Sequence, residues 1–213
     1  MRPAATLWFG HVVYGVAGAS IACFMVEQRV PDLSATHLRF LFGADGEMEH
    51  IAWIGRFFAA SSSDSAAAHP DCIVLPERDA LREYLRGQLI ALFAPLIVLL
   101  STYAAISQAS LWALAADYLA YAFAAVGSLM GNSVLGIEES RAFAAVKSPL
   151  STKRGFVAVE HLGQVEYLLE RTSCCRYYQV KNGAYCHSCP GRPMKERIAL
   201  VKQNMERYIT GTT

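Results

Sequence analysis

The chain has 213 residues and 54% of them are hydrophobic, so it can bury a full core without the disulfides that a small secreted domain needs. Its net charge is +1, but the charged residues are distributed unevenly along the chain. Residues 1–140 carry 7 Lys and Arg against 13 Asp and Glu, a net charge of −6, whereas residues 141–213 carry 12 against 5, a net charge of +7. The basic C-terminal third could attract an acidic partner or an anionic substrate. We expect no nucleic acid among the partners.

The N-terminal third predicts a helix, a hairpin and a loop, in that order. Apolar residues recur at helical spacing across residues 7–29. Two strand-like runs, 36–42 and 49–54, then flank the turn dipeptide Asp45-Gly46, which predicts a β-hairpin. The Ser- and Ala-rich segment 59–71 predicts a surface loop.

Two features of the same region indicate a reducing compartment. The first 24 residues have only Arg2 as a basic residue, and their apolar stretch is broken by polar and small residues, so we expect no export signal. Cys23 and Cys72 lie far from the other cysteines without regular spacing, as reduced thiols do. We therefore expect a cytoplasmic protein.

The most apolar stretch runs from Gln88 to Ile106, with an unbroken apolar run over residues 89–100. Those twelve residues are fewer than the ~20 that span a bilayer, and Pro95 should kink or divide the helix. A buried core helix is the preferred interpretation, and a membrane span is the alternative.

The chain then remains helical before it becomes mixed. Helices are expected over residues 110–127 and 132–146, with Glu138-Glu139 on a solvated face. Short strands are expected at 157–160 and 165–169.

Four of the six cysteines fall within sixteen residues near the C-terminus: Cys174, Cys175, Cys186 and Cys189. A disulfide pair, a tetrahedral zinc ion or an iron–sulfur cluster could use four such thiols. The β-prone run 176–180 and the turn dipeptide Asn182-Gly183 predict a hairpin that brings the two cysteine pairs together.

The spacing of the cysteines bears on the kind of metal centre. The two-residue spacing of Cys186 and Cys189 lets both sulfurs face one metal. Adjacent side chains in a strand point to opposite faces, so Cys174 and Cys175 need a bend or must bind different irons. Two bridged irons tolerate that irregularity better than a zinc tetrahedron does. A zinc site could also recruit His187.

A basic environment surrounds these thiols in the sequence. A helix is expected from Pro193 onward, and its N-terminus carries a partial positive charge. Full positive charges come from Arg171, Arg176, Arg192 and Lys195. Positive charge stabilises the reduced form of an anionic cluster and should raise its potential.

Residues 171–178 (RTSCCRYY) followed by Cys186-x-x-Cys189-Pro190 resemble the C-terminal signature of the FhuF-like ferric siderophore reductases, with two adjacent cysteines, about ten residues and CxxC. Residues 30–34 and Leu111-Trp112 are similar to that family in kind and order. The resemblance implies a 2Fe-2S protein that reduces ferric iron held by a siderophore of the hydroxamate type. It also implies the cluster ligands, which are Cys174, Cys175, Cys186 and Cys189.

The expected partners are a ferric siderophore and an electron donor such as a ferredoxin or an NAD(P)H-dependent reductase, with peripheral association at the inner membrane as a further possibility. The alternatives are a zinc-stabilised interaction module and a membrane-associated redox or uptake protein. Tyr177, Tyr178 and Tyr185 could form a contact surface beside the cluster, although packing is the commoner role of such residues.

The expected fold is α+β and mostly helical. It has an N-terminal helix and β-hairpin, a central helical core, and a C-terminal cysteine-rich hairpin and helix. We divide the chain into a helix-rich domain with a small β-hairpin, residues 1–150, and an iron–sulfur binding segment, residues 151–213.

Overall fold

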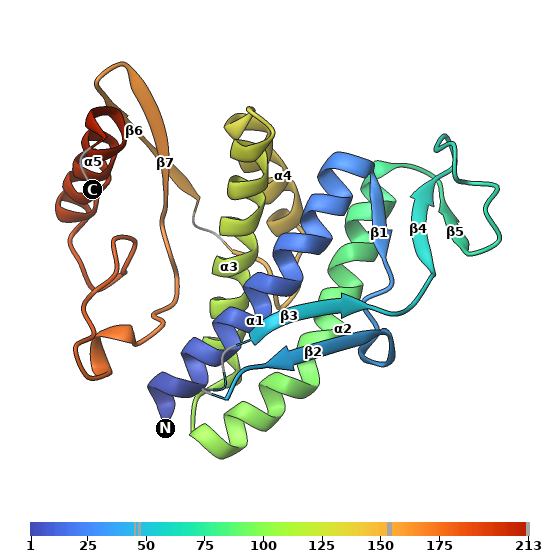
Figure 1. The fold of residues 1–213 in the computed structure, drawn as a ribbon, viewed down its shortest axis with the longest axis horizontal. Coiled ribbons are helices and arrows are strands. Elements are labelled where there is room, and N and C mark those ends of the chain that lie inside the picture. Colours follow the sequence, from blue (N-terminus) through green and yellow to red (C-terminus); the bar gives the residue numbers. More distant parts are fainter. Residues whose placement is uncertain (45, 47, 153–154, 212–213) are drawn as a thin grey trace.

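A computed structural model describes residues 1–44, 46, 48–152 and 155–211 (Figure 1). The chain is mostly helical with small sheets, which confirms the predicted α+β class. Its elements are α1 (Arg2–Ala22), the π-helical turn η1 (Cys23–Glu27), β1 (Arg29–Pro31), the short 3-10 helix η2 (Ala35–His37), β2 (Leu38–Phe42), β3 (Met48–Trp53), β4 (Phe58–Ser61), β5 (Cys72–Leu75), α2 (Arg78–Ala104), α3 (Gln108–Leu129), α4 (Ser133–Ala145), β6 (Phe156–His161), β7 (Gln164–Leu169), the 3-10 helix η3 (Tyr177–Gln179) and α5 (Met194–Thr210).

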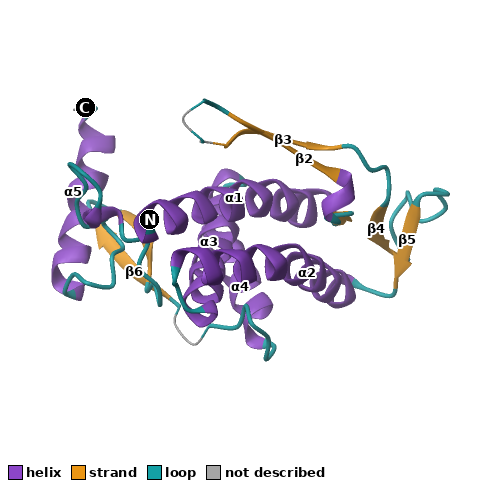
Figure 2. Ribbon diagram, turned by 90° about the horizontal axis from the view of Figure 1, so that it is seen from below, coloured by secondary structure: helices purple, strands orange, loops and turns teal. Residues whose placement is uncertain are grey.

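The four helices α1 to α4 pack together in the middle of the molecule (Figure 2). Aromatic rings join them: Phe9 of α1 meets Phe93 of α2 edge-on at 6.0 Å, and Phe24 meets Phe123 of α3 at 6.4 Å. All four of these rings are fully buried. The helices predicted at residues 7–29, 110–127 and 132–146 are confirmed.

Two glycines set the distance between α3 and α4. A Cβ atom on Gly136 would lie 2.4 Å from the carbonyl oxygen of Phe123, and one on Gly127 would lie 2.6 Å from the Cα of Gly136. No side chain fits there, so the backbones of the two helices are in direct contact. Asn132 caps α4, because its side-chain oxygen accepts a hydrogen bond from the N–H of Leu135 at 3.0 Å.

The predicted β-hairpin is confirmed, because β2 and β3 pair antiparallel from Leu38 opposite Trp53 to Phe42 opposite Met48. Of the predicted turn dipeptide, Asp45 lies outside the described residues, and Gly46 has a φ of +81°. A backbone angle in that region favours glycine.

The prediction of a surface loop over residues 59–71 is wrong at its start. β4 pairs antiparallel with β1 and parallel with β5, and its residues Ala59 and Ala60 are fully buried. A segment rich in alanine and serine has the composition of a loop. Here the small side chains of Ala59 and Ala60 are buried in the core. This second sheet lies at the opposite end of the helices from α5 (Figure 2).

The prediction that residues 88–106 form a buried core helix is wrong for its second half. Pro95 lies inside α2 without dividing it. Beyond it, Val98, Leu99 and Tyr103 are 50%, 52% and 76% exposed. By length and composition alone, three helical stretches could cross a membrane, namely α1 with η1, α2 and α3, and the most apolar 18 residues of each are 56%, 28% and 56% buried.

Glu139 is not on a solvated face, as the sequence had suggested for Glu138-Glu139. Its carboxylate is buried and accepts hydrogen bonds from Arg78 at 2.9 Å and Arg82 at 3.0 Å, both from α2. Its neighbour Glu138 is exposed. The two arginines come from a distant part of the chain, so helical periodicity alone could not reveal the pair.

The C-terminal part contains the predicted strands as an antiparallel hairpin, β6 and β7, packed against α5. Val159, Leu168, Val201 and Met205 form a small core there, separate from the core of the four-helix region. A long loop, residues 170–193, joins β7 to α5 and passes beside the start of α1 and the first half of α3 (Figure 1). This loop carries all four clustered cysteines.

Candidate metal centre

A single carboxylate anchors the start of the cysteine loop. Asp117 of α3 is 3% exposed and accepts hydrogen bonds from the backbone N–H and the hydroxyl of both Thr172 and Ser173, at 2.6–3.0 Å. The guanidinium of Arg171 lies 3.6 Å from the same carboxylate. Hydrogen bonds to a buried charge are among the stronger ones in proteins, so Asp117 fixes the chain just before the first cysteine.

The adjacent cysteines lie in a bend and not in a strand. Arg176 has a φ of 60°, and its backbone N–H donates a hydrogen bond to the sulfur of Cys174 at 3.4 Å. The hydroxyl of Thr6 donates to the carbonyl oxygen of Cys175 at 2.8 Å and so ties this bend to α1. Cys175 is buried in the main core, whereas Cys174 is partly exposed.

The predicted β-hairpin between the cysteine pairs is wrong. Residues 176–180 contain the 3-10 helix η3, and no strand forms in the described part of this loop. Asn182 takes a positive φ of 63°, and the N–H of Gly183 bonds to the carbonyl of Val180 at 2.9 Å, so the chain does turn back here. A turn with one positive φ suits a compact loop, whereas the predicted hairpin turn needs two.

The second cysteine pair lies in its own turns. The N–H of Cys189 bonds to the carbonyl of Cys186 at 3.1 Å, and the N–H of Arg192 bonds to the carbonyl of Cys189 at 3.0 Å. Cys189 is 2% exposed. These consecutive turns keep Cys186 and Cys189 near one another, but each thiol pairs with a cysteine of the first pair and not with the other.

The four cysteines come together as two pairs across the loop. The thiol of Cys174 lies within hydrogen-bonding reach of Cys189, and that of Cys175 within reach of Cys186. The structure thus brings together all four residues that the sequence singled out. Cys23 and Cys72 are free thiols in other parts of the fold.

The hydrogen bond with Cys186, more than the charge around the thiol, favours a thiolate at Cys175. The hydrogen bond with Cys186 lowers the pKa of Cys175 to about 5, against the effect of burial and with help from the N–H of Tyr177 and the guanidinium of Arg171. The same hydrogen bond, together with burial, raises the pKa of Cys186. Burial likewise raises the pKa of Cys174. A deprotonated thiol is the form that binds metal.

The basic residues predicted around the cluster differ in their roles. The Nη1 atom of Arg171 donates to the sulfur of Cys186 at 3.7 Å, and this guanidinium lies over the ring of Tyr118 at 5.6 Å. Arg192 holds the loop instead, donating to the carbonyls of Tyr185 at 2.9 Å and Cys186 at 3.3 Å.

The thiols form two pairs, and His187 lies apart from them. Within the described ranges, no group of three or more His, Cys, Asp or Glu side chains converges on a point that could hold a single metal ion. Two thiol pairs side by side match a 2Fe-2S cluster, which is held by four thiolates. His187 is engaged elsewhere, because its Nδ1 lies 2.9 Å from the side-chain nitrogen of Asn204 on α5.

The three tyrosines of the loop are exposed, and two of them pack on each other. The rings of Tyr178 and Tyr185 stack at 4.5 Å, and Tyr177, Tyr178 and Tyr185 are 45%, 39% and 44% exposed. Arg192 lies over the Tyr185 ring at 5.8 Å. The packing role expected from the sequence therefore applies to Tyr178 and Tyr185.

Sequence reasoning missed Asp117 and Thr6. Asp117 does carry a signal, since it is the only charged residue between Arg86 and Glu138 in a strongly apolar part of the chain. A lone charge on an apolar helix is almost never fully buried without a partner. Thr6 carries no such signal, because threonines near the start of a helix are ordinary.

Two family models match the chain. The family model described as Ferric iron reductase FhuF-like transporter matches residues 6–156, more than half of the chain. The family model described as FhuF 2Fe-2S C-terminal domain matches residues 171–190, which include all four clustered cysteines. No curated protein and no solved structure matches the chain.

Proposed function

Because the chain belongs to the FhuF-like family of ferric iron reductases and matches that family's 2Fe-2S domain over residues 171–190, we propose that it reduces ferric iron held by a siderophore and releases ferrous iron. We propose a hydroxamate siderophore as the substrate. The proposed cluster ligands are Cys174, Cys175, Cys186 and Cys189. The observation that carries the proposal is the meeting of these four thiols in two pairs on a loop anchored by α1 and α3.

The pairing suggests how the thiols share two irons. Cys174 and Cys189 would bind one iron, and Cys175 and Cys186 the other, so each iron takes one ligand from each half of the loop. Adjacent cysteines cannot readily face the same metal, and this arrangement does not require it, because Cys174 and Cys175 would bind different irons.

When bound, a 2Fe-2S cluster accepts and passes on one electron. Hard oxygen donors hold ferric iron tightly, and ferric iron that gains one electron becomes ferrous and is held far more weakly by the same donors. The residues of this chain position the reaction: Asp117 fixes the loop, Thr6 holds Cys175 against α1, and Arg171 places a positive charge next to Cys186. A positive charge next to Cys186 would favour the reduced state of the cluster.

We further propose a cytoplasmic location, and an electron donor such as a ferredoxin or an NAD(P)H-dependent reductase. The free state of Cys23 and Cys72 is compatible with a reducing compartment. The net charge of +7 over residues 141–213 suits an acidic donor such as a ferredoxin.

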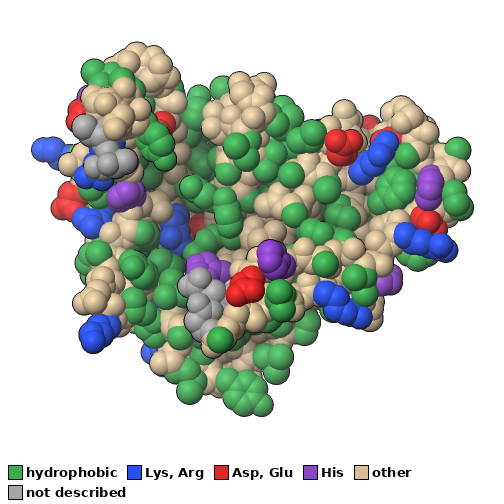
Figure 3. Space-filling model, in the orientation of Figure 1, with side chains coloured by type: hydrophobic (Ala, Val, Ile, Leu, Met, Phe, Trp, Pro, Cys, Tyr) green, Lys and Arg blue, Asp and Glu red, His purple; other side chains and the backbone are tan. Residues whose placement is uncertain are grey.

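Peripheral membrane association is proposed for the apolar end of the molecule. No charged residue lies between Arg86 and Asp117, and the C-terminal half of α2 exposes Val98, Leu99 and Tyr103. Figure 3 shows hydrophobic side chains and no Lys, Arg, Asp or Glu at the lower end of the molecule, over this half of α2. Exposed apolar patches of this kind mark protein or membrane contacts.

The test of the proposed function begins with protein purified without oxygen. We expect red-brown protein with about two irons and two acid-labile sulfides per chain, bleached by dithionite and restored by a ferric hydroxamate. Colourless protein with about one zinc per chain would contradict the proposal.

Single substitutions test the ligand set. Cys175→Ser should lose the cluster, whereas Cys72→Ser, the matched control outside the loop, and His187→Ala should keep it. If Cys175→Ser retains both the cluster and the reductase activity, the ligand assignment is wrong.

A further inference from the structure

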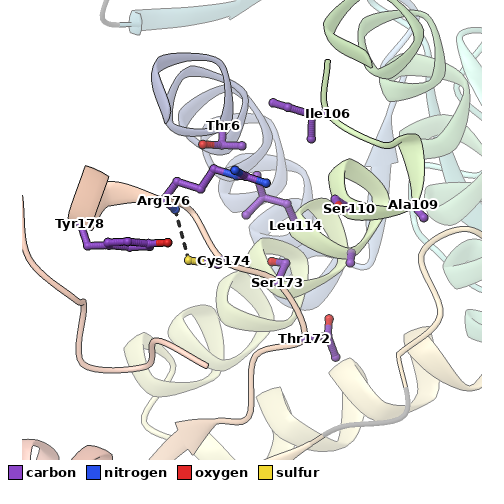
Figure 4. A pocket seen from close by; sticks show the side chains of 11 residues that line it. Thr6, Ile106, Ala109, Ser110, Leu114, Thr172, Ser173, Cys174, Arg176 and Tyr178 are labelled. Carbon is purple, nitrogen blue, oxygen red and sulfur yellow. Dashed lines mark hydrogen bonds between the residues drawn. The ribbon is translucent and has the colours of Figure 1, made fainter. Parts of the chain in front are cut away.

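A cavity of about 460 Å³ opens next to Cys174, between the start of α1, the start of α3 and the cysteine loop (Figure 4). Its volume falls in the range of small-molecule sites. The lining is rich in oxygen atoms, with hydroxyl groups from residues of all three elements, and it includes the cysteine itself: Thr6, Ser110, Thr172, Ser173, Cys174 and Tyr178.

One charge dominates this cavity. Of the described residues that line the cavity, Arg176 alone is charged, and none is a carboxylate. Among the described residues, no carboxylate pairs with its guanidinium, and the side chain extends from the cysteine loop toward Leu114 (Figure 4). A partly buried guanidinium without a counter-ion favours an anionic ligand with oxygen atoms.

Arg176 and the proposed cluster ligand Cys174 lie in the same bend of the loop and line the same cavity. Arg176 donates its N–H to the sulfur of Cys174 and takes a left-handed conformation, so its side chain and that sulfur belong to the same bend. Since both residues line the cavity, a ligand that fills it lies next to Cys174, which is the more exposed of the two adjacent cysteines.

The oxygen groups of Thr172 and Ser173 are held in place from behind. Both hydroxyls donate their protons to Asp117, which is not part of the lining. Their oxygen lone pairs can accept hydrogen bonds only from N–H or O–H groups of a ligand, and Ser110 and Ser107 share a hydrogen bond at 2.7 Å at the start of α3. The polar wall is thus fixed before any ligand enters, which lowers the entropy cost of binding.

We propose that this cavity is the docking site for the ferric complex, and that it prefers an oxygen-ligated complex with a net negative charge, held by the guanidinium of Arg176. The inference rests on the proposed function. One electron passes to the docked Fe(III), which becomes Fe(II), while the cluster that supplied the electron returns to its oxidised state. No bond forms between the protein and the complex.

A redox-inert probe separates docking from reduction. The gallium(III) complex of a linear trihydroxamate has the shape of the ferric complex but does not accept the electron, and its terminal amine can be left free, acetylated or succinylated to make it positive, neutral or negative. Calorimetric titration of the cluster-loaded protein should show the tightest binding for the negative complex.

The variants assign that preference to Arg176. Arg176→Gln should weaken binding of the negative complex about tenfold, which is about 1.4 kcal/mol, and remove the charge ranking, because the charged hydrogen bond to the ligand is lost. The affinity of Arg176→Lys for the negative complex should lie between those of Arg176→Gln and the unmodified protein. Lys181→Gln removes an exposed charge from the same loop, outside the cavity, and should bind as the unmodified protein does. Ala113→Leu, which fills the cavity without changing its charge, should weaken all three complexes alike.

Equal binding of the negative complex by Arg176→Gln and the unmodified protein would overturn the docking site. Failure of the proposed function has a different signature: the gallium complexes bind with the expected dependence on Arg176, but the matching ferric complexes do not reoxidise the reduced cluster, although hexaammineruthenium(III) does. The absorption spectrum and the reduction potential of each variant confirm that its cluster is intact.

Discussion

At the scale of single residues, Asp117 is the side chain on which the cysteine loop depends. It is buried in α3 and accepts four hydrogen bonds from Thr172 and Ser173. We expect Asp117→Asn to lower the free energy of unfolding by about 2–4 kcal/mol, because the amide nitrogen would face N–H donors and Arg171 would lose its buried counter-charge. Urea unfolding measures the stability, and the iron content after gel filtration measures how well the loop holds the cluster.

Glu138→Gln is the matched control for this substitution. It removes a carboxylate from the exposed face of α4, and such surface changes stay within about 0.5 kcal/mol. If Asp117→Asn keeps both the stability and the iron content of the unmodified protein, Asp117 does not anchor the loop.

At the scale of secondary-structure elements, the contact between α3 and α4 leaves no room for a side chain at Gly136. Gly136→Ala would place a Cβ atom 2.4 Å from the carbonyl oxygen of Phe123, and the helices must move apart to accept it. We expect a loss of about 1–3 kcal/mol in the free energy of unfolding, as for other overpacked sites. Thermal and urea unfolding would measure it.

Gly87→Ala makes the same chemical change in the middle of α2, where a Cβ atom would meet nothing within 4 Å. Alanine favours a helix over glycine, so this variant should gain about 0.5–1 kcal/mol. If Gly136→Ala lowers the free energy of unfolding and Gly87→Ala raises it, the contact between α3 and α4, and not helix propensity, determines the effect at Gly136. Changes of the same sign in both variants would contradict this explanation.

At the scale of the whole molecule, the apolar end of α2 should bind a bilayer surface. Near that end, a groove of about 650 Å³ is lined by Trp8 of α1, Leu100 of α2 and Tyr177 of the cysteine loop, so the proposed cluster would lie close to the membrane. We expect the protein to float with liposomes of bacterial lipid composition, and Leu99→Glu with Tyr103→Glu to abolish the flotation.

Leu129→Glu is the control for this double substitution, because Leu129 is 89% exposed at the other end of the bundle, in the last turn of α3. It should float as the unmodified protein does. Liposome binding that survives the double substitution would exclude this face. A dimer that the double substitution dissociates in sedimentation experiments would assign the face to a second copy of the chain instead.

Local patterns in the sequence were enough to predict much of this architecture. Helical periodicity identified α1, α3 and α4, and turn residues identified the β2–β3 hairpin, because each of these elements depends on residues a few positions apart. The cysteine spacing identified the candidate metal centre for the same reason. The four thiols lie within sixteen residues, so any compact loop brings them close.

Contacts between distant parts of the chain required the tertiary structure. The partners of Asp117, the arginines that pair with Glu139 and the burial of β4 all involve residues that are far apart in sequence. The exposed half of α2 is the converse case, because hydropathy reports how apolar a helix is and not whether another element covers it. The thiol pairing and the cavity beside Cys174 likewise depend on how α1, α3 and the loop pack, since pairing and shape are properties of three-dimensional neighbours.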